Sequence, residues 1–156
     1  MEVNNIKDLF IGERNFIANA SNLCAFIYYN YPDINWVGFY MLSGNELVLG
    51  PFQGKIACIR IQIRKGVCGT AVSEQKSIIV PDVNKFPGHI VCDSASQSEM
   101  VIPIVFQDKI IGLLDIDSPI KNRFDTKDEE MFKSFLRYLC ESSDVCKVID
   151  YYNNEN

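Results

Sequence analysis

Apolar side chains recur at intervals of three or four residues near both ends of the chain. Near the start, this spacing runs over residues 6–27 and predicts one amphipathic helix, which ends at the Asn-Tyr-Pro-Asp sequence of residues 30–33. Residues 131–140 have the same periodicity, and the preceding residues 126–129, Thr-Lys-Asp-Glu, have the form of a helix capping box. The pattern therefore predicts a helix at each end of the fold.

Between these helices the pattern is typical of strands. Short runs rich in aromatic and β-branched residues are separated by turn residues, such as Ser-Gly-Asn at 43–45 and Gln-Asp at 107–108. The expected strands are residues 36–42, 46–50, 58–63, 77–80, 100–106 and 109–117. The glycines of residues 66–72 suit a sharp turn that opens a short inserted helix.

This order of elements predicts an α+β fold. We expect a single domain over residues 1–156, with a polar tail at about 151–156. Its mostly antiparallel central sheet has about six strands, and the N- and C-terminal helices pack on one face. The apolar stripe of residues 6–27 could pack against that sheet or pair two chains as a homodimer.

Composition narrows the class of protein. The chain is 47% hydrophobic and 22% charged, as globular proteins are, and its net charge is -5. No strongly basic segment is present, which argues against nucleic acid or an anionic membrane as the main partner. Neither a secretory signal nor a run of 18 apolar residues is found, so we expect no membrane span and a cytoplasmic location.

In that compartment six cysteines favour reactive or metal-binding roles over a disulfide framework. Cys58 starts an expected strand, Cys68 lies in the glycine-flanked turn, and Cys92 lies in the long loop of residues 81–98. Small, mostly polar neighbours should leave the Cys92 thiol accessible, which favours a functional role. The remaining cysteines lie on expected helices: we expect Cys24 and Cys140 to pack in the core, and Cys146 to be inert on the last helix.

Two other roles for these cysteines stay open. Structural zinc sites usually carry cysteines as close pairs, whereas nine residues separate Cys58 from Cys68 and 23 separate Cys68 from Cys92. A Cys3His site therefore has little support from spacing. His89, the single histidine, could help form the Cys92 thiolate as a Cys-His pair, or it could be a solvent-facing loop residue.

Acidic and aromatic residues supply further candidates. Glu99 immediately precedes an expected strand, and Asp115 and Asp117 end an apolar one with their side chains on the same face. Neighbouring carboxylates repel, so one could have a raised pKa and donate a proton, or the acids could bind a cationic amine or cap the strand end. Trp36 and Tyr40 share a strand face and could clasp a small cation or methyl group, or simply pack in the core.

Taken together, these segments resemble the free methionine-(R)-sulfoxide reductases, which are built on a GAF domain. The matching segments, in chain order, are 35–40 (NWVGFY), 49–55 (LGPFQGK), 57–61 (ACIRI), 66–71 (GVCGTA), 80–83 (VPDV), 86–96 (FPGHIVCDSAS), 98–99 (SE), 114–119 (LDIDSP) and 123–125 (RFD). They extend over residues 35–125, and generic GAF domains lack this pattern of three cysteines.

The resemblance implies a thiol mechanism with no metal or organic cofactor. Cys92 resembles the cysteine that attacks the sulfoxide, Cys58 the cysteine that resolves the sulfenic acid, and Cys68 a third cysteine that can join the disulfide exchange. The roles of Cys68 and Cys92 could also be exchanged. Thioredoxin is the implied reductant, and oxidative stress is the implied setting.

The resemblance also implies how the substrate binds. Trp36 and Tyr40 resemble the aromatic wall around the methyl-sulfur end of free methionine-(R)-sulfoxide. Glu99, Asp115 and Asp117 resemble the acids that bind the sulfoxide oxygen and the amino group. The main alternative is a non-catalytic GAF sensor with redox-responsive cysteines, because a fold does not by itself determine a function. A structural zinc module is the second alternative.

Overall fold

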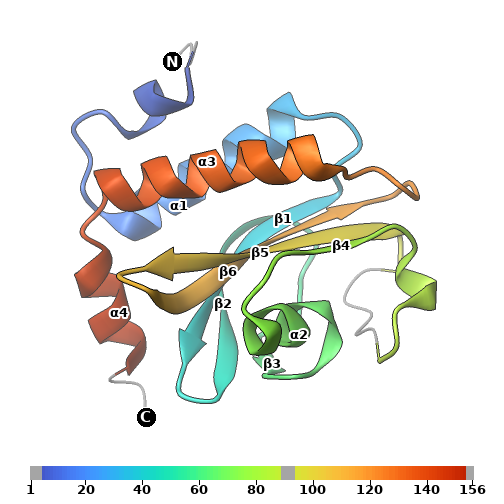
Figure 1. Ribbon diagram of the computed structural model, residues 1–156. Coiled ribbons are helices and arrows are strands. Elements are labelled where there is room, and N and C mark those ends of the chain that lie inside the picture. Colours follow the sequence, from blue (N-terminus) through green and yellow to red (C-terminus); the bar gives the residue numbers. More distant parts are fainter. Residues whose placement is uncertain (1–4, 89–93, 154–156) are drawn as a thin grey trace.

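One antiparallel sheet organises the molecule in the computed structural model, which describes residues 5–88 and 94–153 (Figure 1). The elements in chain order are η1 (Ile6–Phe10), α1 (Phe16–Asn30), β1 (Trp36–Ser43), β2 (Glu46–Gly54), β3 (Arg60–Gln62), α2 (Gly66–Glu74), β4 (Ile78–Val80), η2 (Val83–Lys85), β5 (Ser98–Phe106), β6 (Lys109–Ser118), α3 (Thr126–Ser142) and α4 (Val145–Asn153). The six strands lie in the order β3-β2-β1-β6-β5-β4, and every neighbouring pair is antiparallel. The predicted α+β class and strand number are confirmed.

Helices cover both faces of this sheet (Figure 1). The long helices α1 and α3 lie together on one face, over a core that includes Leu23, Ile27 and Phe132. The short helix α2 packs on the other face, where Val67 and Ala71 are buried against the sheet. The predicted placement of the terminal helices on one face is confirmed. Among the helices that the structure describes, none is both long enough and apolar enough to cross a membrane.

The prediction of one continuous helix over residues 6–27 is wrong. The chain forms the short 3-10 helix η1, passes through Gly12 at a φ of 78°, and starts α1 at Phe16. Asn15 caps α1, because its side chain accepts a hydrogen bond from the Ala18 backbone N–H. Both segments have apolar residues at helical spacing, so the periodicity alone hides the break between them.

At the other end, the capping box lies one residue earlier than predicted. Asp125, not Thr126, is the N-cap, and its carboxylate and the Asp128 carboxylate each accept a backbone N–H from the other residue. The separate helix α4 continues to Asn153. Its Tyr152 is buried and accepts a hydrogen bond from Ser43 Oγ at 2.8 Å, so helix continues further into the polar tail than the sequence indicates.

In the middle of the chain both predicted hairpins form. The turn between β5 and β6 places Gln107 and Asp108 at φ angles of 49° and 60°, as a tight hairpin turn requires. The predicted strand over residues 58–63 is shorter, because only Arg60–Gln62 pairs with β2. Cys58 therefore lies in the loop before β3 rather than at the start of a strand.

Candidate functional site

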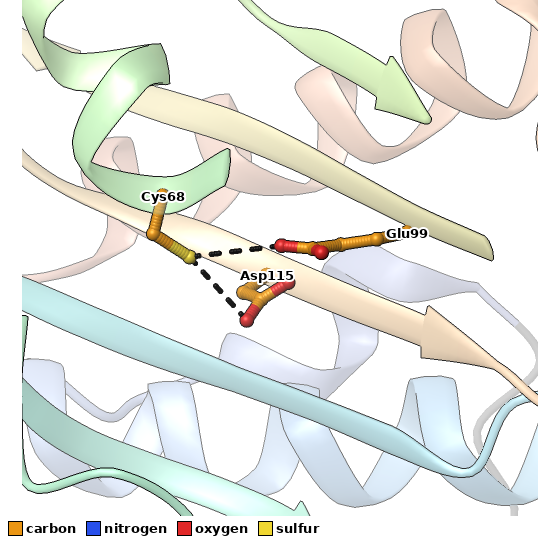
Figure 2. A group of neighbouring side chains, drawn as sticks. All are labelled: Cys68, Glu99 and Asp115. Carbon is orange, nitrogen blue, oxygen red and sulfur yellow. Dashed lines mark hydrogen bonds between the residues drawn. The ribbon is translucent and has the colours of Figure 1, made fainter. Parts of the chain in front are cut away.

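Helix α2 carries Cys68 to the sheet. Gly66 begins the helix at a φ of 60°, a conformation that glycine adopts without strain. A Cβ atom on Gly69 would collide with the carbonyl oxygen of Gln62, so only glycine permits this close approach of α2 to β3. The two glycines fix the first turn of α2 under the sheet, and Figure 2 shows the Cys68 side chain directed at the strands.

Strand register brings the acids to the same place. Glu99 on β5 lies opposite Asp117 on β6, and Asp117 lies opposite Trp36 on β1. Asp115 is two residues before Asp117 and therefore shares its face of the sheet. All four side chains belong to the face that α2 covers.

Cys68, Glu99 and Asp115 form a compact buried cluster (Figure 2). The Cys68 thiol donates to Asp115 Oδ2 at 3.5 Å and approaches Glu99 Oε1 at 3.9 Å. The exposed fractions of the three residues are only 5%, 6% and 7% respectively. Two carboxyl groups and a thiol thus share a space that water barely reaches.

Burial and nearby carboxylates keep Asp115 and Cys68 of this cluster protonated. Burial, followed by the nearby Glu99 carboxylate, raises the pKa of Asp115 well above its usual range. Burial and the charges of Asp115, Glu99 and Asp117, in that order, also raise the pKa of the Cys68 thiol. The sequence leaves open which acid has the raised pKa. In the structure that acid is Asp115, and its main charged neighbour is Glu99. Cys68 rests as a thiol rather than a thiolate.

One oxygen of the cluster stands out. Asp115 Oδ1 is fully buried and has no hydrogen-bond partner among the described residues. Buried polar atoms in proteins are nearly always paired, and those that are not are often functional. This oxygen is available to a ligand in the same space.

Next to the acids lies a stack of three aromatic rings. The Trp36 ring stacks on Tyr40, with centroids 6.0 Å apart, and on Phe52 at 5.5 Å. A Cβ atom on Gly38 or Gly54 would collide with the Trp36 ring, so these glycines make room for the indole to lie along the sheet. Phe52 was not among the predicted site residues, although it stands in the matching 49–55 segment.

The polar atoms of two of these rings hold the loop that carries Cys58. Trp36 Nε1 donates to the Lys55 carbonyl at 3.0 Å, and the Tyr40 hydroxyl donates to the Cys58 carbonyl at 2.8 Å. Cys58 itself is half-buried. The aromatic wall and the Cys58 loop are therefore one connected structure, a contact that no local sequence pattern indicates.

The structure thus unites most of the predicted residues in two adjoining groups. Cys68, Glu99 and Asp115 meet directly, while Trp36 and Tyr40 contact the loop of Cys58. Cys92 and His89, predicted as nucleophile and possible helper, lie outside the described residues. The other described cysteines are away from this site on helices α1, α3 and α4, as predicted: Cys24, Cys140 and Cys146.

The buried cluster also has donors for a metal ion. One ligand atom from each of Cys68, Glu99 and Asp115 lies within 4.8 Å of the others. A metal would require the thiolate and the carboxylates, whereas burial raises the pKa of both Cys68 and Asp115. Metal binding here would therefore have to displace these protons and would be strongly pH-dependent.

Comparison with known proteins places the chain among similar sequences and structures. A family profile described as GAF domain matches residues 18–140. Free methionine-R-sulfoxide reductase of Escherichia coli is 50% identical over 131 residues, which are 84% of this chain and 79% of that protein. The structure of reduced fRMsr from Staphylococcus aureus superposes with a TM-score of 0.84 at 51% identity, covering 88% of this chain and 89% of that one.

A second similar structure was solved with its substrate. Free methionine-R-sulfoxide reductase from Neisseria meningitidis, solved in complex with its substrate, is 37% identical and has a TM-score of 0.84. The match covers 88% of this chain and 83% of that chain. Both sequence and fold therefore agree over nearly the whole length of these proteins.

Proposed function

The chain belongs to the GAF domain family, and we propose that it is a free methionine-R-sulfoxide reductase, an oxidoreductase that converts free L-methionine-(R)-sulfoxide to methionine. The observation that carries the proposal is the buried cluster of Cys68, Glu99 and Asp115, which keeps a proton beside an unpaired acid oxygen. Two relatives named free methionine-R-sulfoxide reductase, 50% and 46% identical to this chain, support the proposal.

The acids make the sulfoxide reactive. A sulfoxide sulfur is a poor electrophile until its oxygen is protonated or strongly hydrogen-bonded. A carboxylic acid that stays neutral near pH 7 can supply that bond, and the raised pKa of Asp115 suits this role. Glu99 maintains the raised pKa through its own charge, and Asp117 adds negative charge on the same face.

The cysteines then carry the electrons. The Cys92 thiolate attacks the sulfoxide sulfur, methionine leaves, and the sulfoxide oxygen remains on Cys92 as a sulfenic acid. The Cys58 thiol attacks this sulfenic acid, which forms a disulfide and releases water. Thioredoxin reduces the disulfide by thiol exchange and returns the enzyme to its starting state. Because burial and nearby acids hold Cys68 as a thiol, it fits the third, exchanging cysteine better than the nucleophile.

The same groups select the substrate. The Trp36, Tyr40 and Phe52 stack offers an apolar wall to the methyl-sulfur end. Negative charge from the acids suits the ammonium group of a free amino acid, which a peptide-bound residue lacks. The proposed preference for the free substrate follows from that charge.

The test of this function is turnover of resolved sulfoxide epimers. With dithiothreitol or thioredoxin as reductant, we expect methionine from the free R epimer and none from the S epimer. N-acetylated methionine-(R)-sulfoxide, which lacks the ammonium group, is the matched control and should react at least about tenfold more slowly, as expected when a site's buried charge is left unpaired. No methionine from either epimer, with folded and fully reduced protein, would instead favour the ligand-binding sensor.

Tyr40→Phe tests the contact between the aromatic wall and the resolving cysteine. The variant retains the ring but loses the hydrogen bond to the Cys58 carbonyl. One hydrogen bond corresponds to about 0.5–1.5 kcal/mol, so we expect multiple turnover to slow by about 2- to 10-fold. The first equivalent of methionine, measured by rapid quench, should form at the wild-type rate. A first turnover slowed by the same factor would instead indicate that the Tyr40 hydroxyl itself acts on the substrate.

A further inference from the structure

The loop before β3 exposes two large apolar side chains. Ile56 is 91% exposed and Ile59 is 71% exposed, and they flank the half-buried Cys58 at two residues before it and one after it. Single apolar residues on a surface are ordinary, whereas apolar residues gathered at one place often mark an interaction site. Here they stand beside Cys58 in the same loop, and the proposed reaction must leave the Cys58 thiol open to an external reductant.

The backbone of this loop is held, so the isoleucines cannot simply fold inward. The carbonyls of Lys55 and Cys58 accept the hydrogen bonds from Trp36 and Tyr40. The Ile59 carbonyl accepts a third from the Leu49 backbone N–H at 2.9 Å. Three fixed carbonyls within five residues keep both isoleucines directed to solvent.

The charge around the loop is opposite to that of the whole protein. The net charge of the chain is -5, yet no acidic residue occurs between Glu46 and Glu74. Four exposed basic residues lie in that interval: Lys55, Arg60, Arg64 and Lys65. Arg60 pairs with Glu46 at 2.9 Å, which leaves the interval positive overall. An acidic partner would be attracted to this exposed basic segment and repelled by the net negative charge of the rest of the chain.

Access to the sulfur atoms points to the same place. Cys68 is only 5% exposed on the face of the sheet that α2 covers, so its thiol is poorly accessible to the thiol of another protein. Cys58 is half-buried in the exposed loop. Among the described cysteines of the site, it is therefore the one that a protein thiol can approach.

We propose that Ile56 and Ile59, within their basic surroundings, are the docking surface for a dithiol protein reductant whose thiol lies on an apolar face with an acidic rim. This inference rests on the proposed function, because it assumes a disulfide that includes Cys58. The reductant thiolate attacks Cys58 Sγ, which forms a mixed disulfide and releases the other cysteine as a thiolate. The second thiol of the reductant then attacks the sulfur of the reductant's first cysteine in this mixed disulfide. Cys58 leaves as a thiolate, so two electrons have passed to the enzyme.

The experiment compares a protein reductant with a small one. In Ile56→Asp/Ile59→Asp, the thioredoxin-dependent kcat/KM should fall at least tenfold, because the apolar contact is lost and negative charge meets an acidic partner. Turnover with dithiothreitol, which needs no docking surface, should stay within twofold of wild type. Ile11→Asp, a change at a residue 78% exposed on the N-terminal segment, is the control and should affect neither rate. Added salt should lower the wild-type thioredoxin rate alone.

Other outcomes separate this inference from the function on which it rests. An unchanged thioredoxin rate in the double variant, or an equal loss with both reductants, would overturn the docking surface. A wild-type dimer that dissociates in the double variant would overturn it too, since a second copy would then cover the isoleucines. Wild-type protein inactive with dithiothreitol would contradict the proposed reductase itself. Docking is then tested without turnover, by trapping Cys58 in a mixed disulfide with thioredoxin that lacks its second cysteine.

Discussion

Cys92→Ser is expected to form no methionine, even from one equivalent of sulfoxide, whereas Cys58→Ser should form one equivalent and then stop. In the proposed mechanism Cys92 makes the only bond to the substrate sulfur, so its loss removes the chemical step. Cys58 acts after methionine has left, so its loss leaves a sulfenic acid on Cys92. A Cys68→Ser variant should retain the first turnover, because burial and the neighbouring acids already hold Cys68 as an unreactive thiol.

The measurement counts methionine per enzyme by rapid quench, without reductant for the first equivalent and with thioredoxin to show whether further turnovers follow. Mass spectrometry of the quenched Cys58→Ser protein, after addition of a sulfenic-acid trap, should locate the adduct on Cys92. Cys146→Ser is the matched control, since this exposed cysteine on α4 takes no part in the mechanism. Single-turnover activity retained in Cys92→Ser but lost in Cys68→Ser would require the two roles to be exchanged.

The sequence predicts the sheet better than the helix ends. Runs of aromatic and β-branched residues, bounded by the turns at 43–45 and 107–108, locate both hairpins, because such residues favour strands and the turn residues end them. The helical period of three to four continues across Gly12, where the chain leaves η1 before α1 begins. Likewise Asp125 and Thr126 both suit an N-cap, and only the hydrogen bonds select Asp125.

The sequence likewise predicts some features of the candidate site and not others. Alternation along one strand places Asp115 and Asp117 on the same face, and the raised pKa follows from elementary electrostatics. Glu99 as the main partner of Asp115 could not be predicted, because it depends on the register between β5 and β6 and on the depth of burial. The hydrogen bonds from Trp36 and Tyr40 to the Cys58 loop depend on side-chain positions in three dimensions and have no local sequence signal.

Asp115→Asn is expected to lower the rate of methionine formation by about 10²- to 10⁴-fold, the usual contribution of a general acid. Asparagine is nearly the same size and can still donate a hydrogen bond, but it cannot transfer the proton. The wild-type rate should fall as the pH rises through the raised pKa of Asp115, because the neutral acid is then lost. That alkaline decrease should be absent from the pH profile of Asp115→Asn.

The same substitution should make the protein more stable. The folded-state pKa of Asp115 is raised above its unfolded value of about 3.9, so between these two values the folded state holds a proton that the unfolded state releases. The free energy of unfolding of the wild type therefore falls with rising pH over this interval and then levels off. Asparagine removes this dependence, so urea denaturation should show equal stabilities at about pH 4 and a growing advantage for Asp115→Asn above it.

Glu99→Gln separates the two causes of the raised pKa. Loss of the Glu99 charge removes its repulsion, while burial of Asp115 remains the larger effect, so the pKa of Asp115 should fall only part of the way. The alkaline decrease in rate should consequently move to lower pH in Glu99→Gln rather than disappear. A decrease that persists unchanged in Asp115→Asn would assign it to another group, and a loss of stability in both variants would make the buried acids structural. If the burial of Asp115 serves the reaction, we expect the opposite: the wild-type acid lowers the stability of the fold, and its replacement raises it.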